Sequence, residues 1–281
     1  MLLRILTRVR HGRLRSFRRM WVPLRFIYRV SLLVPMDWTV SKYIGPYGPF
    51  KFHRRFAFSN FSKFGVNLKS KNRGFQEFVQ ACRGRTCVFD VGAHIGLVSL
   101  PASSRMASRG VIYSFEPSPG NVKYLTYHLK KNKISNVEVV RKLVHASESD
   151  SSSIFLASED SDMNSIAPGL LQTSYSLQEV PAVSIDSFCS ENELRPELIK
   201  IDVEGAEISV LEGAAEVLQS VKPTLFLSVH PGYIKALGRS TAELQELLSS
   251  AGYTISDFDG NIIDISDSEG ESEYIVAPAA I

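Results

Sequence analysis

Short apolar segments rich in β-branched and aromatic residues alternate along the chain with segments whose apolar residues recur at helical spacing. The first kind is typical of buried strands and the second of amphipathic helices. The predicted core strands are 86–91, 110–115, 137–144, 198–201 and 224–230. The helices expected between them include 97–106, 119–132 and one that follows Gly205 through Leu218. Strand, helix and strand in alternation predict an α/β fold with a parallel sheet and right-handed crossovers.

The segments outside this alternation give weaker signals. Residues 147–179 are serine-rich and predict a surface insertion that contains Asn164, a candidate contact to a substrate. Ser118, followed by Pro119, predicts a capped helix start, and Ser240 opens a capping box. Two closing strands are expected near the end of the chain, at 253–257 and 273–277.

The first core strand ends in a turn that contains two glycines. Asp90 lies at the end of the strand, and Gly92 and Gly96 follow it. A residue without a Cβ lets the backbone turn sharply and approach a ligand closely. A dinucleotide-binding turn requires the spacing Gly-x-Gly-x-x-Gly, and this segment has no third glycine. The turn therefore lacks the seat for a diphosphate.

The second core strand is followed by an acidic residue, Glu116. A carboxylate at this place in an α/β sheet accepts hydrogen bonds from the hydroxyls of a ribose. A nucleoside without a diphosphate fits this arrangement, and S-adenosylmethionine is the commonest cofactor of that kind. A dehydrogenase that binds a nicotinamide dinucleotide is the competing enzymatic interpretation, and the missing glycine disfavours it.

Polar residues also end two later strands. Asp202 and Glu204 follow the strand that ends at Ile201, and His230 ends the next one. Because the carboxyl ends of parallel strands meet at one edge of a sheet, we expect these side chains to share a site with the glycine turn. Any one of them alone would be a weak signal, since terminal acids are often helix caps and a lone histidine is often structural.

Several of these segments resemble a known protein family. The segments are FDVGAHIG (89–96), SFEPSP (114–119), VSID (183–186), IKIDVEGAE (199–207) and VLEGA (210–214). Together they closely resemble the FkbM-type S-adenosylmethionine-dependent methyltransferases, over residues 75–278. The resemblance implies a class I methyltransferase fold. This is a Rossmann-like three-layer sandwich around a mostly parallel seven-stranded sheet with an antiparallel last strand.

The resemblance also implies an activity and a set of cofactor contacts. The cofactor would be S-adenosylmethionine, and the acceptor a hydroxyl of a sugar, glycan or secondary metabolite. Gly92 and Gly96 would let the backbone approach the cofactor, and Glu116 would hold its ribose. Asp90 and Asp202 would order the turn and the methionine end of the cofactor.

Two residues depart from the family's pattern. His94 stands where the family often has asparagine, which leaves the turn intact and changes a polar group that we expect to contact the cofactor. Ser228 stands where the fifth strand commonly carries a glutamate two residues before its histidine. How His230 is oriented in this chain is therefore open.

Catalysis by such an enzyme depends mainly on positioning, because methyl transfer from a sulfonium is an in-line displacement with a good leaving group. An alcohol is a poor nucleophile at neutral pH, so a general base is useful. His230 is the first candidate, since its ordinary pKa lies at about 6.5, and Glu204 is the second. We expect no metal. The alternatives are a metal held by Asp202, Glu204 and His230, or a purely structural His230.

Composition and charge divide the chain unevenly. Its 281 residues are 44% hydrophobic and 22% charged, which is typical of a globular protein with one sizeable core. Residues 1–60 contain 13 Lys and Arg against one acid, whereas the rest carries an excess of acids. We therefore predict a basic, aromatic-rich extension over 1–74 and a methyltransferase domain over 75–281. Three cysteines without a Cys-x-x-Cys support neither a disulfide framework nor a zinc site and favour the cytoplasm.

The role of the basic extension stays open. Apolar residues recur at helical spacing from Leu14 to Tyr28 with arginines on the other faces, and Arg25 and Arg29 interrupt any membrane-spanning run. The interpretations are a helical cover on the domain, peripheral membrane contact or a lipid-linked-substrate role through residues 1–40, and a disordered, targeting or nucleic-acid-binding segment. Aromatic and basic residues over 41–75 favour short packed strands over a nucleic-acid platform. An RNA-modifying protein is thus the less favoured alternative to a small-molecule or glycan methyltransferase.

Overall fold

The computed structural model describes residues 38–62, 73–156 and 176–279. The chain divides into two units, Met1–Lys63 and Phe64–Ile281. The helix predicted from Leu14 to Tyr28 and the candidate Asn164 lie outside the described residues. The division at residue 74 stays a prediction.

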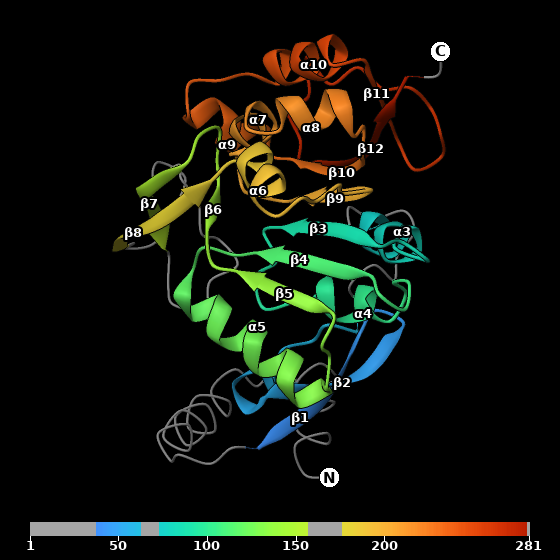
Figure 1. The fold of residues 1–281 in the computed structure, drawn as a ribbon, viewed down its shortest axis with the longest axis vertical. Coiled ribbons are helices and arrows are strands. Elements are labelled where there is room, and N and C mark those ends of the chain that lie inside the picture. The colour runs from blue at the N-terminus through green and yellow to red at the C-terminus, as the bar shows by residue number, and fades with distance from the viewer. Residues whose placement is uncertain (1–37, 63–72, 157–175, 280–281) are drawn as a thin grey trace, which may run out of the picture. The chain divides into compact units, whose positions relative to one another are not determined.

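The larger unit is built on a seven-stranded sheet with the order β11-β12-β10-β9-β3-β4-β5 (Figure 1). Its strands are β3 (Cys87–Val91), β4 (Val111–Phe115), β5 (Val137–Val140), β9 (Leu198–Ile201), β10 (Thr224–Val229), β11 (Tyr253–Ser256) and β12 (Ser272–Pro278). The neighbours from β10 to β5 pair in parallel, and β12 runs antiparallel to both β10 and β11. The predicted class I methyltransferase sheet, with its antiparallel last strand, is confirmed.

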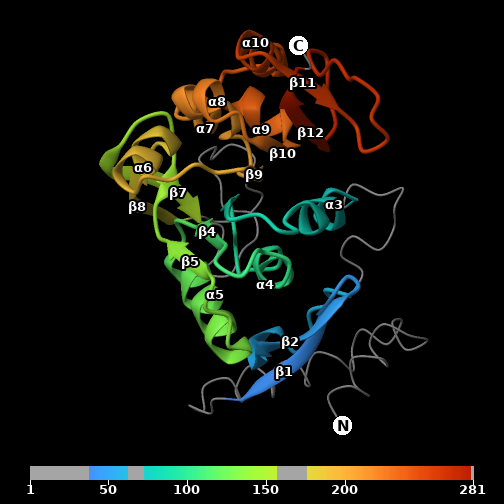
Figure 2. The ribbon, with the colours of Figure 1, turned by 45° about the vertical axis from the view of Figure 1, so that its right-hand side comes forward.

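Helices cover both faces of this sheet (Figure 2). One face lies under α3 (Arg73–Ala81), α4 (Ser99–Ser103) and α5 (Pro119–Asn132). The other lies under α6 (Ile185–Glu191), α7 (Glu207–Glu212), α8 (Ala215–Ser220), α9 (Pro231–Ala236) and α10 (Thr241–Ser250). On the first face the rings of Phe78 in α3 and Phe226 in β10 meet at 5.4 Å between centroids. Alternation along each strand divides its side chains between two apolar layers, which accounts for the three-layer sandwich.

The centre of the second layer is aromatic. Phe89 in β3 is fully buried, and its ring contacts those of Tyr113, Phe115 and Phe188 at centroid distances of 5.6, 5.3 and 5.8 Å. All three contacts are edge-to-face, the arrangement that aromatic rings prefer. Phe89 thereby joins β3, β4 and α6 just below the glycine turn.

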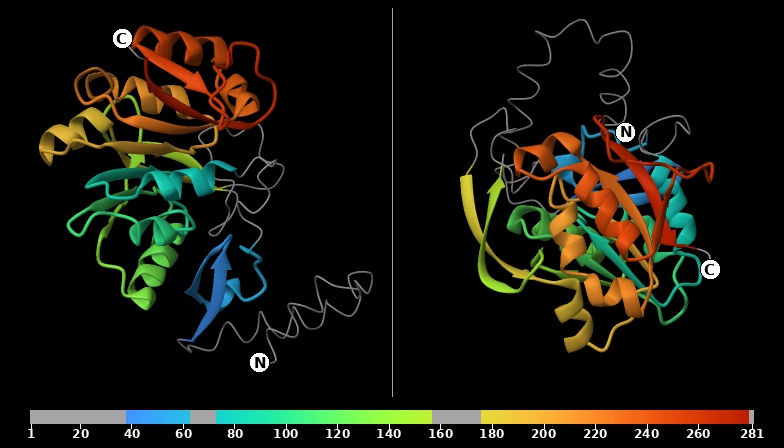
Figure 3. Two further views of the ribbon diagram at one scale, coloured as in Figure 1. Left: turned by 90° about the vertical axis from the view of Figure 1, so that its right-hand side faces the viewer. Right: turned by 90° about the horizontal axis from the view of Figure 1, so that it is seen from above.

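A second, three-stranded sheet has the order β6-β8-β7 and stands apart from the main sheet (Figure 3). Its strands are β6 (Leu143–Val144), β7 (Ser149–Leu156) and β8 (Ser176–Val183). The prediction of a single strand over 137–144 is therefore wrong, because β5 and β6 are separate strands that belong to different sheets. The chain bends between them, where the N–H of Lys142 donates to the carbonyl of Val140 at 2.9 Å.

The helix predicted to run past Gly205 through Leu218 is also divided, into α7 and α8. At Gly213 a Cβ would lie 2.3 Å from the carbonyl oxygen of His145, so another backbone segment approaches the chain at the break. The predicted helix 97–106 shortens to α4. These differences arise from tertiary contacts that helical spacing does not encode.

The two predicted helix caps have different outcomes. Ser240 caps α10 as predicted, and its Oγ accepts from the N–H of Glu243 at 3.2 Å. Ser118 occupies the N-cap position of α5, but its hydroxyl makes no capping hydrogen bond. Its backbone N–H donates instead to Glu116 Oε1 at 2.9 Å. The carboxylate of Glu116 therefore takes part in the helix start that was predicted to depend on the serine.

The smaller unit contains an antiparallel hairpin of β1 (Thr39–Ile44) and β2 (Tyr47–His53), followed by the 3₁₀ helix η2 (Arg54–Phe56). The rings of Phe52 and Phe61 pack at 5.0 Å between centroids, and Phe52 is fully buried. The predicted short strands are confirmed over this part of the extension, whereas the packing of their aromatic residues under the sheet or along a substrate cleft stays a prediction. Across the described ranges, no helix has both the length and the apolar character needed to cross a bilayer.

Replacing Phe89 by alanine should lower the free energy of unfolding by about 3–5 kcal/mol, because it removes a fully buried ring and leaves a cavity. Urea unfolding followed by circular dichroism measures the change. Ile262→Ala is the matched control, since Ile262 is 77% exposed and its truncation should change stability by about 0.5 kcal/mol or less. Equal effects of the two substitutions would contradict this account of the core.

Candidate active site

The glycine turn after β3 lies against the segment that follows β9. The N–H of Asp202 donates to the carbonyl of Val91 at 3.0 Å, and Gly92 adopts a φ of 86°. A Cβ on Gly92 would lie 2.0 Å from the carbonyl oxygen of Asp202, well inside van der Waals contact. Gly92 is therefore required by both its backbone conformation and the close approach of a neighbouring chain segment.

The second glycine of the turn has a different packing requirement. Gly96 has a φ of 90°, and a Cβ there would lie 2.5 Å from Leu100 and 2.6 Å from Leu125. The absence of a side chain lets α4 and α5 pack directly against the turn. Between the glycines, His94 also has a positive φ, of 50°, so three alternate residues of the turn are left-handed.

Glu116, predicted to hold the ribose, accepts hydrogen bonds from three protein donors. Oε2 accepts from the N–H of His94 at 2.8 Å, while Oε1 accepts from the N–H of Ser118 and from Asn121 Nδ2 at 2.9 and 3.2 Å. A carboxylate offers about four acceptor positions, so these described donors leave one for a ribose hydroxyl. Burial raises the pKa of Glu116 to about 7, with the three donors opposing the shift.

Asp90 and Lys200 face each other in register on adjacent strands, β3 and β9. Lys200 Nζ lies 3.8 Å from Asp90 Oδ1, and Ser99 Oγ donates to Asp90 Oδ2 at 2.5 Å. Burial raises the pKa of Asp90, although Lys200 and Ser99 oppose it. The structure thus places Asp90 beneath the turn as a fully buried partner of Lys200.

Asp202 lies between two basic side chains at the end of β9. Its Oδ2 is 3.0 Å from Lys200 Nζ, and its Oδ1 is 3.7 Å from His230 Nε2. Burial would raise the pKa of Asp202, but Lys200 and His230 outweigh it and hold that pKa below its ordinary value. Burial would lower the pKa of Lys200, but the carboxylates of Asp202 and Asp90 outweigh burial and raise that pKa overall.

His230 has a carboxylate oxygen opposite each ring nitrogen. Nδ1 lies 2.6 Å from Glu207 Oε1, and Nε2 faces Asp202. Burial would lower the pKa of His230, but the hydrogen bond to Glu207 and the nearby carboxylates raise it to about 9. At neutral pH the ring is therefore an imidazolium. The expectation that an ordinary pKa makes His230 the first candidate for a general base loses its physical basis.

Glu204 follows Asp202 with a φ of 51°, next to Gly205, whose φ is 104°. A Cβ on Gly205 would lie 2.6 Å from Cβ of Tyr233, so the loop packs against α9. Burial raises the pKa of Glu204 to about 7, and the charge of His230 partly opposes this shift. Glu204 is thus half-protonated near neutral pH, close enough to His230 for their charges to interact.

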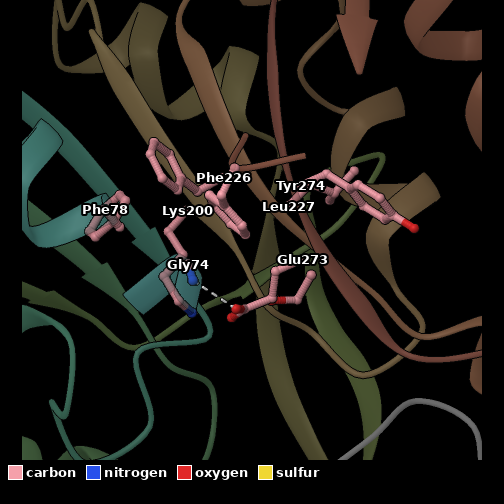
Figure 4. A pocket seen from close by; sticks show the side chains of 9 residues that line it. Gly74, Phe78, Lys200, Phe226, Leu227, Glu273 and Tyr274 are labelled. Carbon is pink, nitrogen blue, oxygen red and sulfur yellow. Dashed lines mark hydrogen bonds between the residues drawn. The ribbon is translucent and has the colours of Figure 1, made fainter. Parts of the chain in front are cut away.

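A small cavity lies beside Lys200 on the face covered by α3 (Figure 4). Its lining is mostly apolar, with Lys200 and Glu273 as the charged members. Glu273 Oε2 accepts from the N–H of Gly74 at 3.0 Å, and burial raises the pKa of Glu273 to about 7. In the described parts of the chain, no cluster of three or more His, Cys, Asp or Glu could hold a metal ion. The alternative metal site at Asp202, Glu204 and His230 therefore has no geometric support.

The structure brings Asp202, Glu204 and His230 together and links Asp90 to them through Lys200. Glu116 is bonded to the backbone N–H of His94 in the turn. Sequence reasoning missed Lys200, Glu207 and Glu273 as members of the site. Lys200 and Glu207 stand inside the segment 199–207 and were noticed only as part of a motif. For Lys200 the available signal was its place two residues before Asp202 in the same motif. Glu273 had none, because the antiparallel pairing of β12 decides its position.

The strand order and the glycine turn define a class I methyltransferase. A family model described as Methyltransferase FkbM domain matches residues 90–255, more than half of the chain. The chain belongs to the FkbM methyltransferase family, and the resemblance seen in its motifs is confirmed. Its cofactor is S-adenosylmethionine.

Several solved structures are similar to this chain. An FkbM methyltransferase from Methylobacillus flagellatus KT is 20% identical, with a TM-score of 0.44, over 68% of this chain and 43% of that chain. The match thus spans less than half the length of that protein. A putative methyltransferase from Streptococcus mutans in complex with SAH is 10% identical, with a TM-score of 0.44, over 75% and 99% of the two chains. A search of curated proteins gave no match.

The residues at the turn fit this cofactor. Gly92 and Gly96 leave the backbone bare where the turn begins and ends, and Glu116 keeps one acceptor position for a sugar hydroxyl. The ionised carboxylate of Asp202, held at the same rim, suits the positively charged methionine end of the cofactor. The site therefore offers bare backbone and carboxylate groups, and groups of this kind can bind a nucleoside that carries an amino acid.

Gly92→Ala should abolish binding of S-adenosylhomocysteine in calorimetry, because the added Cβ would collide with the carbonyl of Asp202 and displace the turn. Gly84→Ala is the matched control. Gly84 also has a left-handed φ, of 73°, but a Cβ there meets nothing within 4 Å. The control should lose about 1–2 kcal/mol of stability and keep its affinity. Unchanged affinity in Gly92→Ala would contradict this account of the turn.

Proposed function

We propose that this chain is an S-adenosylmethionine-dependent O-methyltransferase that acts on a hydroxyl of a sugar, glycan or secondary metabolite. The observation that supports the oxygen-directed reaction is a carboxylate with a pKa of about 7, Glu204, at the rim that carries the cofactor turn. A hydroxyl acceptor has a proton that must leave during attack, and a base titrating near the working pH removes it most effectively.

Glu204 is the first candidate for this base. When bound, the cofactor supplies a methyl group on a sulfonium, which leaves as a neutral thioether. The acceptor oxygen forms the new bond to carbon, and its proton passes to the carboxylate of Glu204. His230 acts as a cation and hydrogen-bond donor at the same rim, because both of its nitrogens face carboxylates. Sequence reasoning ranked these two residues in the opposite order.

The cofactor-binding roles follow from the same geometry. Gly92 and Gly96 let the backbone approach the cofactor closely. Glu116 binds one ribose hydroxyl and also accepts a hydrogen bond from the N–H of His94. Asp202 binds the positively charged methionine end. Asp90 is buried and does not bind the cofactor itself. It positions Lys200, and Lys200 positions Asp202.

The proposal predicts transfer of label from S-adenosylmethionine carrying a labelled methyl group to an acceptor in fractionated cell extract. The label should appear in a methyl ether, which resists mild base, whereas a methyl ester releases methanol under the same treatment. Mass spectrometry of the labelled fraction identifies the acceptor. Label that is found only in nitrogen-linked methyl groups or in RNA would reject the hydroxyl acceptor.

With that acceptor, kcat/KM should rise with pH through about 7 and level off above it, because Glu204 must be deprotonated to accept the proton. Glu204→Gln should lower kcat by about 10²- to 10⁴-fold and remove this limb, while affinity for S-adenosylhomocysteine stays within a few-fold. The exposed Glu246→Gln is the control. A limb that lies near pH 9 in the unmodified enzyme would instead assign the base to His230.

A further inference from the structure

Glu207 is a fully buried carboxylate in the first turn of α7. Its Oε1 accepts from His230 Nδ1 at 2.6 Å and from the N–H of Gly205 at 3.1 Å. Its Oε2 is also buried and makes no hydrogen bond with the described residues. A buried acceptor without a donor costs stability, so a residue that served only to fill the core would be better as a neutral or apolar side chain.

Glu207 is the last member of a row of side chains with alternating charges, and His230 stands next to it. From Asp90 the row passes through Lys200, Asp202 and His230 to Glu207, with contacts of 3.8, 3.0, 3.7 and 2.6 Å. Nδ1 must carry a proton to donate to Glu207. A neutral ring would then present the lone pair of Nε2 to the carboxylate of Asp202. Protonation of Nε2 replaces this repulsion with attraction, so the geometry itself favours the imidazolium.

We propose that Glu207 is the positioning residue of this site: it fixes the ring of His230 so that the Nε2 proton points at Asp202 and the acceptor side of the rim. Glu207 is fully buried and acts through His230. Its catalytic consequence rests on the proposed function, whereas its effect on the ring of His230 does not.

The charged and titratable groups that face His230 come from four elements or loops. They are Glu207 in α7, Asp202 and Glu204 after β9, Glu273 in β12 and Tyr233 in α9. Among these four carboxylates, Glu207 is the one that shares a short hydrogen bond with His230. It should therefore have the largest effect on the protonation of the ring.

The direct test is nitrogen NMR of the full chain labelled at histidine, with the His230 signals assigned by their absence in His230→Gln. In the unmodified protein both ring nitrogens should be protonated at pH 7.5. In Glu207→Gln the midpoint of the His230 titration should fall by about 1–3 pH units, as expected when an opposite charge within hydrogen-bond reach is lost. Glu212→Gln, in the same helix and exposed, is the control and should leave the midpoint unchanged.

Kinetics then separate positioning from folding. Glu207→Gln should lower kcat while the dissociation constant for S-adenosylhomocysteine changes by less than about threefold, and Glu207→Asp, which keeps the charge, should recover part of both the titration midpoint and kcat. A neutral His230 at pH 7.5 in the unmodified protein, which requires no variant, would overturn the proposal. So would an unchanged midpoint in a folded Glu207→Gln.

The two proposals fail in different measurements. Absence of methyl transfer to any hydroxyl would reject the proposed function, while a lowered His230 midpoint in Glu207→Gln would still support the link from Glu207 to the ring. Conversely, full methyltransferase activity together with an unmoved His230 midpoint would overturn the link and leave the function standing.

Discussion

The contact between the carboxyl ends of β3 and β9 is the constraint on which the site depends. The two strands pair in parallel, and the backbone continues the pairing beyond them through the bond from Asp202 to Val91. The carbonyl of Asp202 then occupies the space where a side chain on Gly92 would stand. This approach holds the glycine turn against the segment that carries Asp202 and Glu204.

The same strand pairing sets the electrostatics. Because Asp90 and Lys200 are in register, a buried cation stands directly beneath the rim. A buried pair of this kind gives little net stability, since desolvation of both groups opposes their attraction. Its effect lies in position: Lys200 also reaches Asp202, and this carboxylate stays ionised and oriented although burial acts against its charge.

The arrangement assigns different tasks to chemically similar groups. Asp202, beside two cations, has a lowered pKa, whereas Glu204, two residues away, has a pKa of about 7 because burial dominates there. His230, beside Glu207, is charged at neutral pH. Carboxylates and imidazoles whose protonation states diverge in this way can bind a cation, accept a proton and donate a hydrogen bond within one site.

The sequence by itself determined the alternation of strands and helices, the glycine turn, the family, and the acids and histidine at the strand ends. These are local signals, because strand periodicity, closely spaced glycines and acids at strand ends can be recognised within short stretches of neighbouring residues. The sequence pattern could not show that β5 and β6 belong to different sheets. Nor could it show that Glu116 accepts hydrogen bonds from three donors of the protein itself.

Only the tertiary structure decided which polar groups act on one another. Glu207 and His230 are 23 residues apart, and the bond between them reverses the expected charge state of the histidine. Glu273 enters the site because β12 pairs antiparallel with β10. A pKa depends on burial and on charges within a few ångströms, and those distances are fixed by packing between distant segments and not by the order of residues along the chain.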